Sequence, residues 1–331
     1  MEMTQRFRFE AEDGSLASEA RRAALALAAR RGLDETEAGK VAVVVAEAAT
    51  NLVKHGGGGE LLVAPSLGPT GVEVLALDRG RGMANPAACM RDGYSTAGTA
   101  GTGLGAISRL ATRFDIHSTP TSGTALVARV GAASVCGAFD VGGVAVPAPG
   151  ESVCGDAWST VAMADGLRVL VVDGLGHGAV AGEAAAQAVA AFEATGTRPL
   201  EEIMEAVHGA LRSTRGAAVG IASIDTRRRV VTFTGVGNVA GVIVGEATAR
   251  NTVSHGGIMG HGVRRTQLFT YPWPPGGLLV MLSDGIASQW SLDAYPGLRQ
   301  RDPALIAGVI YRDFVRGRDD ATVVVVRERP S

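Results

Sequence analysis

The residues best suited to chemistry lie at the end of an apolar stretch, Val169 to Gly182, with the sequence VLVVDGLGHGAVAG. Four apolar residues end at Asp173, and a glycine-rich turn leads from there into an alanine-rich helix. A buried strand that presents a carboxylate at its tip and then turns sharply is one way to build a site for a hard metal ion. Gly174, Gly176 and Gly178 would let the backbone approach an ion closely and adopt positive φ. Because Asp-Gly is also an ordinary turn sequence, a metal site here requires partners elsewhere in the chain.

Three further carboxylates occupy similar positions. Asp156, Asp284 and Asp319 each lie beside a glycine or another aspartate where an apolar strand is expected to begin or end. Carboxylates on converging strands repel one another unless divalent cations neutralise them. Carboxylate and water ligands without His or Cys favour Mg²⁺ or Mn²⁺ over zinc. Two such ions about 3.5–4 Å apart can activate water against a phosphoryl group, so we assign no nucleophilic role to Ser283 or Cys154.

Polar residues of the first half suggest a nucleotide site. Glu47 and Asn51 lie four positions apart in an expected helix and therefore share a face. An asparagine so placed can bind Mg²⁺ beside a triphosphate, and a nearby glutamate can act as a general base toward a hydroxyl. Asp78 ends an expected strand, where it can accept a hydrogen bond from an adenine amino group. Taken alone, Glu47 and Asn51 would be read as a polar helix face.

Glycine-rich turns surround these residues. Gly80 and Gly82 follow Asp78 directly, and Thr102, Gly103 and Gly105 open a helix whose N-terminus can hold phosphate. Thr124 begins the last strand of the first half. The order of these features is more specific than any one of them.

The elements that position these residues alternate between strands and separate blocks of helices. Helices are predicted over 15–31, 34–54, 106–114, 180–194, 199–213 and 302–315. This pattern favours an α+β fold over a doubly wound parallel sheet. We expect two domains, 1–130 and 139–331, joined by a short linker at 131–138.

Composition narrows the function classes. The 331 residues carry a formal net charge of -2 with no long run of one sign, which argues against binding nucleic acid or membranes through bulk charge. The 3 cysteines are widely spaced and form no CxxC pair, so neither a zinc site nor a disulfide framework is indicated. No apolar run reaches membrane-spanning length. We expect a cytoplasmic protein.

The motifs of the first half resemble those of the GHKL ATPases. EAATN (47–51) resembles the N box, DRGRG (78–82) the first glycine box and GTGLG (101–105) the second. The compact form is similar to the RsbW/RsbT serine-kinase branch. The resemblance implies a Bergerat-type α/β sandwich that binds ATP with Mg²⁺. It makes Glu47 the base, Asn51 the metal ligand and Asp78 the adenine reader.

In the same resemblance, Gly80, Gly82, Gly103 and Gly105 shape the ATP pocket and its lid, and Thr102 and Thr124 belong to the same cofactor site. The phosphate acceptor in that family is a serine or threonine on a small STAS-domain protein.

The motifs of the second half resemble the SpoIIE-type branch of the PPM (type 2C) Ser/Thr phosphatases. CGD, VVDGLGHG, GVGN, SDG and DDATVVVV occur in order over about 139–327. The resemblance implies an α-β-β-α sandwich with two Mn²⁺ or Mg²⁺ ions. Asp173 would bridge both ions with the Gly174 carbonyl on one, Asp284 and Asp319 would complete the other site, and Asp156 would contact an ion directly or support one that does.

The first phosphatase motif of this chain differs from that of many family members. CGDAWST (154–160) lacks the second aspartate found in many members, and is similar to the short RsbX-like phosphatases. His177, within GLGHG, could serve as a proton donor to the leaving oxygen, although the family motif tolerates other residues there.

These resemblances together imply a bacterial partner-switching protein. The second domain would remove phosphate from Ser or Thr of a STAS-domain antagonist or stressosome protein, and the first would bind ATP and phosphorylate a related STAS serine. In the alternative, the first domain is a nucleotide-regulated binding module that sequesters a STAS protein or a sigma factor, without turnover. A sigma factor or a kinase of the same switch would be a further partner of the protein.

Overall fold

The computed structural model describes residues 4–10, 15–90, 103–132, 136–246, 248–262 and 266–329. They form two compact units. The N-terminal unit comprises described residues of 2–135 together with 291–312, and the C-terminal unit comprises those of 136–290 and 313–331. We call residues 291–312 the inserted segment, because the chain leaves the C-terminal unit, contributes to the N-terminal unit and then returns.

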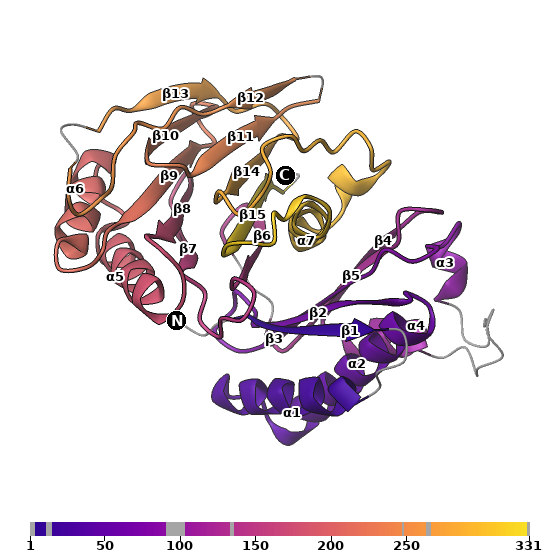
Figure 1. The fold of residues 1–331 in the computed structure, drawn as a ribbon. Coiled ribbons are helices and arrows are strands. Elements are labelled where there is room, and N and C mark those ends of the chain that lie inside the picture. The colour runs from indigo at the N-terminus through magenta and orange to yellow at the C-terminus, as the bar shows by residue number, and fades with distance from the viewer. Residues whose placement is uncertain are drawn as a thin grey trace. The chain divides into compact units, whose positions relative to one another are not determined.

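The N-terminal unit is built on an antiparallel sheet with the order β1-β2-β3-β5-β4. Helices α1, α2 and α4 lie on one face of it (Figure 1). The strands are β1 (Gln5–Glu10), β2 (Gly58–Pro65), β3 (Val72–Leu77), β4 (Arg113–Ser118) and β5 (Thr124–Val130). The helices are α1 (Ser15–Arg30), α2 (Glu35–Lys54), α3 (Pro86–Cys89) and α4 (Gly103–Leu110).

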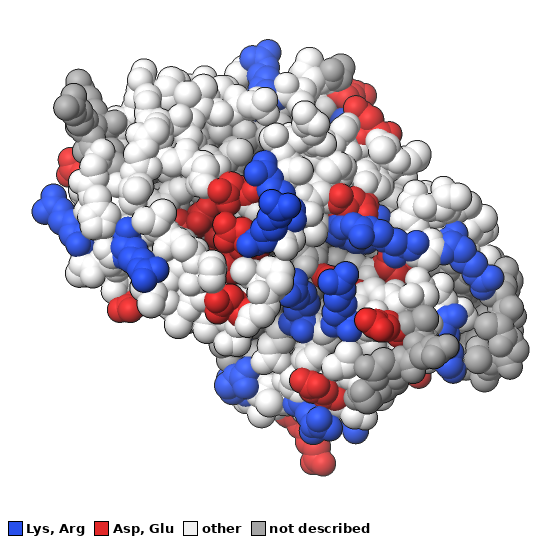
Figure 2. All heavy atoms as spheres, in the orientation of Figure 1, with Lys and Arg blue, Asp and Glu red and all other residues white. Residues whose placement is uncertain are grey.

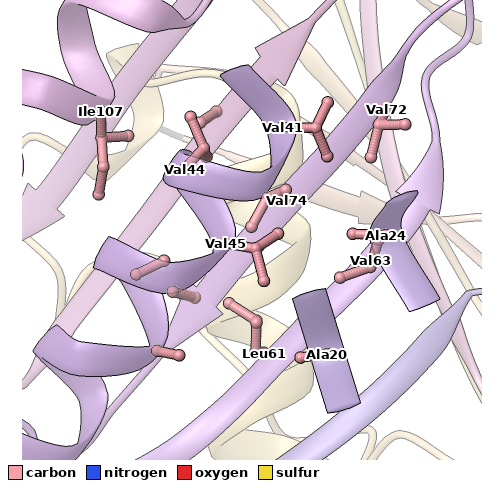
Figure 3. Close-up of a cluster of buried hydrophobic side chains, with 14 of the residues drawn as sticks. Ala20, Ala24, Val41, Val44, Val45, Leu61, Val63, Val72, Val74 and Ile107 are labelled. Atoms are coloured by element: carbon pink, nitrogen blue, oxygen red, sulfur yellow. The ribbon is translucent and has the colours of Figure 1, made fainter. Parts of the chain in front are cut away.

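The core between helices and sheet follows the period of each element. Small and β-branched residues of α1 and α2 meet alternate residues of β2 and β3, as Figure 3 shows for Ala24, Val45, Leu61 and Val74. Helix α2 begins where the sequence predicts, because the Asp34 side chain accepts from the Glu37 amide at 2.8 Å.

Helix α4 is shorter than expected. It ends at Leu110, whereas the pattern predicted a helix through 114. The Thr112 amide donates instead to the Arg129 carbonyl at 2.7 Å, and Phe114 already belongs to β4. Sheet pairing with β5 therefore overrides the helical preference of these residues.

The second face of the N-terminal sheet is covered by the inserted segment, which holds a 3₁₀ turn (Leu298–Gln300) and α7 (Pro303–Phe314). A Cβ at Gly308 would lie 2.8 Å from Leu75 Cδ2 and 3.0 Å from Leu77 Cδ2, so the helix backbone packs directly on β3. The sequence-based division placed these residues with the second domain. The alternation of β3 explains the packing, because Leu75 and Leu77 are buried on the face opposite Val74 and Ala76.

The C-terminal unit contains two antiparallel five-stranded sheets, β13-β10-β9-β8-β7 and β12-β11-β14-β15-β6. Their facing residues, among them Val169, Phe233, Met281 and Val324, form one core. The strands are β6 (Phe139–Val146), β7 (Asp156–Met163), β8 (Gly166–Gly174), β9 (Ala217–Asp225), β10 (Val230–Val236), β11 (Ala240–Val244), β12 (Ala249–Asn251), β13 (Phe269–Pro272), β14 (Leu278–Leu282) and β15 (Ala321–Glu328).

Helices α5 (Ala179–Thr195) and α6 (Leu200–Leu211) pack on the outer face of the first of these sheets (Figure 1). The predicted α+β class is confirmed, with helices and antiparallel sheets in separate layers.

A buried ion pair fixes the inserted segment to the N-terminal sheet. Asp302 accepts from both terminal nitrogens of Arg129, at 2.7 and 2.9 Å, and its side chain is only 1% exposed. Burial by itself would raise the pKa of Asp302, but the hydrogen bond and charge of Arg129 outweigh burial and hold that pKa below its ordinary value.

We expect Arg129→Ala to destabilise the protein by about 3–5 kcal/mol, because it removes the bidentate partner of Asp302 and the partner of buried Glu73, and leaves Asp302 paired with the more exposed Arg113. Lys40→Ala, which removes the more exposed pair with Glu37, should cost at most about 1 kcal/mol. Urea unfolding followed by circular dichroism measures both. Equal costs for the two variants would contradict the assigned importance of the buried pair.

Candidate metal and nucleotide sites

A cluster of carboxylates lies where the strands of the C-terminal unit end. Asp156 and Asp173 are directly opposite each other on β7 and β8. Asp284 follows β14, and Asp319 and Asp320 precede β15. Figure 2 shows acidic side chains gathered over the region of β7 and β8, with basic side chains beside them. The structure therefore brings together aspartates that are far apart in sequence.

Electrostatics show how closely these groups interact. The pKa of Asp173 is raised to about 8, first by burial and then by the charges of Asp156, Asp284, Asp319 and Asp320, in that order of importance. The pKa of Asp156 is raised to about 7, because burial and the charge of Asp320 outweigh the opposing hydrogen bond from Ser283. Without a counter-ion, the cluster holds protons that ordinary aspartates would release.

Two carboxylate oxygens of the cluster lack hydrogen-bond partners. Asp156 Oδ2 and Asp320 Oδ2 are both buried and unpaired, while Asp320 Oδ1 accepts from the Ala148 amide at 2.8 Å. A buried carboxylate oxygen without a donor is costly unless a cation completes its surroundings. This chemistry fits Mg²⁺ or Mn²⁺ better than a metal that needs nitrogen or sulfur ligands.

The cluster is an open arrangement. Among the residues that the structure describes, no three His, Cys, Asp or Glu side chains close around a single point. Mg²⁺ commonly keeps several waters and uses only one or two carboxylates, so a closed cage is not required. Asp320 is the more buried member of its pair, at 2% exposure, whereas Asp319 is exposed.

The turn after Asp173 depends on its glycines in two ways. Gly176 and Gly178 adopt positive φ, at 95° and 75°. Gly174 does not, contrary to expectation; it stays in β8, where a Cβ would lie 2.3 Å from the Ala181 carbonyl oxygen. Close approach of α5, not a left-handed backbone, requires glycine at 174.

Neighbouring side chains complete this region. Asn238 donates to Asp284 Oδ2 at 2.6 Å, which places the GVGN motif beside the cluster. His177 Nδ1 lies 2.7 Å from Glu151 Oε1 in an exposed pair. Sequence analysis missed Glu151, because nothing in the pattern links it to a histidine 26 positions later.

Cys154 and Ser283 are poorly suited to act as nucleophiles. Burial, with the nearby charges of Asp156 and Asp320, raises the pKa of the Cys154 thiol far above its ordinary value. Ser283 is 2% exposed, and its Oγ accepts from the Thr322 amide at 2.9 Å. The two residues instead support the carboxylates around them.

In the N-terminal unit, Asp78 is held in a defined orientation. Its Oδ1 accepts from the Gly80 amide at 2.8 Å and the Thr124 amide at 3.0 Å. Burial raises its pKa, and these two hydrogen bonds oppose that effect. A Cβ at Gly82, where φ is 63°, would lie 2.0 Å from the Thr119 carbonyl oxygen, so the turn after Asp78 requires glycine.

Helix α2 presents Glu47 and Asn51 toward the start of α4. A Cβ at Gly103 would lie 2.9 Å from Glu47 Oε2 and 3.6 Å from Asn51 Oδ1. Asn51 Nδ2 is buried without a hydrogen-bond partner. Gly105 is buried within α4, and Thr102 lies outside the described residues.

The fold and the two groups of residues define a protein that joins a histidine kinase-like ATPase fold to a two-sheet sandwich with a carboxylate cluster. Residues 9–130 match the family described as Histidine kinase-like ATPase domain (HATPase_c_2), and residues 164–329 match Stage II sporulation protein E (SpoIIE). The chain belongs to the SpoIIE family. Both motif resemblances are thereby confirmed at the level of family.

Two Bacillus subtilis (strain 168) proteins are similar to parts of the chain. Phosphoserine phosphatase RsbX is 36% identical over 90 residues, which cover 27% of this chain and 45% of RsbX. Serine/threonine-protein kinase RsbT is 28% identical over 99 residues, which cover 29% of this chain and 74% of RsbT. The match thus spans less than half the length of RsbX.

A solved structure is similar to the chain over a wider range. It is described as "The bacterial stressosome: a modular system that has been adapted to control secondary messenger signaling". The match has a TM-score of 0.54 and 28% identity, and covers 57% of this chain and 99% of that chain.

No helix among the described residues is long and apolar enough to cross a membrane.

The raised pKa values predict how stability depends on pH in the metal-free protein. The folded state keeps protons on Asp173 and Asp156 up to about pH 8 and 7, whereas the unfolded chain releases them near 3.8. The contribution of these two groups to stability should therefore fall as pH rises from about 4 to about 8. Asp173→Asn cannot ionise, so in EDTA it should melt above wild type at pH 8, with the difference shrinking near pH 4.

Thermal melts with and without Mn²⁺ test this prediction. Added Mn²⁺ should raise the melting temperature of wild type at pH 8 and should have much less effect on Asp173→Asn. Asp165→Asn is a matched control, because Asp165 is exposed in the turn at the opposite end of the same hairpin. A pH-independent difference between wild type and Asp173→Asn would refute the electrostatic account.

Proposed function

We propose that the C-terminal unit is a metal-dependent phosphatase that removes phosphate from serine or threonine of a STAS-domain protein. The observation that carries this proposal is the cluster of carboxylates at one set of strand ends, with two buried oxygens that lack partners. Sequence similarity to a phosphoserine phosphatase, RsbX, supports the reaction. The stressosome description of a similar solved structure supports the class of partner.

The chain's own residues define what the cluster can do. Asp173 and the Gly174 carbonyl would hold a pair of Mg²⁺ or Mn²⁺ ions together with Asp156, Asp284 and Asp319. When bound, these ions would supply an activated water and neutralise the charge of the phosphoryl group. Asn238 orients Asp284, and the Ala148 amide orients Asp320. Because no protein nucleophile is involved, the role of the carboxylates would be to hold the metal ions and to align them with the phosphoryl group.

The N-terminal unit, in this proposal, binds ATP with Mg²⁺ and transfers phosphate to a STAS serine. Asp78 has one carboxylate oxygen fixed by backbone amides, which leaves the other to accept from adenine. Asn51 would hold the metal ion and Glu47 would accept the proton of the attacking hydroxyl. Similarity to the kinase RsbT supports transfer.

For the phosphatase, we expect Asp173→Asn to slow Mn²⁺-dependent release of phosphate from a phosphoserine peptide by at least about 100-fold. Loss of metal assistance removes several kcal/mol of transition-state stabilisation, and each 1.36 kcal/mol is worth a factor of ten. Asp165→Asn should retain wild-type activity. Full activity of Asp173→Asn would rule out the proposed metal centre.

For the kinase, Glu47→Ala should abolish transfer from ATP to a STAS serine while leaving nucleotide affinity within about threefold, because the glutamate acts on the hydroxyl and not on adenine. Radiolabelled ATP and a fluorescent ADP analogue measure the two properties. If wild type binds nucleotide but never transfers phosphate to any STAS protein of the same organism, the binding-module alternative replaces the kinase.

A further inference from the structure

The inserted segment is anchored across the whole second face of the N-terminal sheet. Besides the Arg129–Asp302 pair, the Asp302 amide donates to Asp115 Oδ2 at 2.8 Å and His117 Nε2 lies 3.1 Å from the Pro296 carbonyl oxygen. These partners come from β4 and β5. The segment is therefore an integral layer of the N-terminal unit.

The end of α7 reaches the residue proposed to read adenine. Arg312 Nη1 donates to the Asp78 carbonyl oxygen at 2.7 Å, and Arg79 donates in return to the Arg312 carbonyl. Arg312 is only 8% exposed. The neighbouring Tyr311 hydroxyl donates to Glu60 Oε2 at 2.7 Å. Asp78 is thus held from two sides, its carboxylate by Gly80 and Thr124 and its carbonyl by α7.

Both ends of the inserted segment lead directly to the carboxylate cluster. Ser291 follows Asp284 by seven positions, and Asp319 follows Arg312 by seven positions. The two connecting segments are hydrogen-bonded to each other. The Ala287 amide donates to the Phe314 carbonyl at 2.8 Å, and the Arg316 amide donates to the Gly285 carbonyl at 2.8 Å. We call these residues, 285–287 and 314–316, the stem.

We propose that Arg312 and α7 are a positioning part of the nucleotide site, and that through the stem they link nucleotide binding to metal binding at the carboxylate cluster. This inference rests on the proposed nucleotide and metal sites. A nucleotide on the Asp78 carboxylate would stabilise the Asp78–Arg312 contact against opening. Helix α7, held in this way, would stabilise the stem, whose two segments lead to Asp284 and Asp319. Each ligand then lowers the ordering cost of the other, so the two bind with positive cooperativity.

Linkage is reciprocal, which gives a test that does not depend on phosphatase activity. We would measure the affinity of the full-length protein for a fluorescent ADP analogue at one fixed concentration of free Mn²⁺. Asp173→Asn, which removes metal from the cluster, should weaken nucleotide binding at least about fivefold, the lower end for coupled sites. Asp165→Asn should not weaken it. Because free Mn²⁺ is constant, chelation by the nucleotide cannot produce the difference.

The route through α7 is tested by a double-mutant cycle. In an Arg312→Gln background, Asp173→Asn should change nucleotide affinity by less than twofold. An unchanged fivefold effect would refute the route. In the protein that keeps Arg312, Mn²⁺ titration can show that Asp173→Asn has lost its metal. If nucleotide affinity is nevertheless unchanged there, the proposed linkage is wrong. Absence of nucleotide binding in wild type would instead refute the proposed nucleotide site.

A measurement on wild type covers the case in which Arg312→Gln does not fold. Hydrogen exchange of the Ala287 and Arg316 amides reports opening of the stem. The ADP analogue should slow their exchange at least threefold, while the Thr226 amide, in the turn after β9, serves as the reference. Unchanged exchange in the stem at saturating nucleotide would contradict the proposal.

Discussion

The mutual repulsion of clustered aspartates, two of them buried, is the constraint on which the rest of the C-terminal unit depends. Four neighbouring carboxylates lie close enough that each raises the pKa of Asp173, and two oxygens of the cluster are buried without donors. Backbone amides and Asn238 satisfy part of this negative charge. The fold supplies the remaining stability to hold the group together, and a pair of divalent cations is the chemically fitting complement.

The order of the chain makes this cluster sensitive to events elsewhere. Asp284 and Asp319 flank a segment that forms a layer of the N-terminal unit. That segment is held near its middle by the buried bidentate Arg129–Asp302 ion pair and at its C-terminal end by Arg312 on the Asp78 carbonyl. This chain path is the basis of the proposed linkage between nucleotide binding and metal binding.

Motifs with local geometry could be predicted from the sequence. The Asp34 cap of α2, the strand that ends at Asp173 and the α+β class follow from spacing and periodicity. The role of residues 291–312 could not be predicted, because an apolar pattern in α7 and in β3 does not show which element each one packs against. Likewise the Glu151–His177 and Arg312–Asp78 contacts join residues whose separation in sequence gives no signal. Gly174 was expected to need positive φ, but the close approach of Ala181 explains it.

The most direct test of the central claim is the number of Mn²⁺ ions that the nucleotide-free protein binds at pH 7.5. Isothermal titration of metal-stripped wild type should give about two ions per chain, as a paired-metal centre requires. Asp173→Asn should lose both, since this residue is the one proposed to hold both ions, and Asp165→Asn should keep both. Wild-type protein that binds no Mn²⁺, or an Asp173→Asn protein that binds it equally well, would contradict the account.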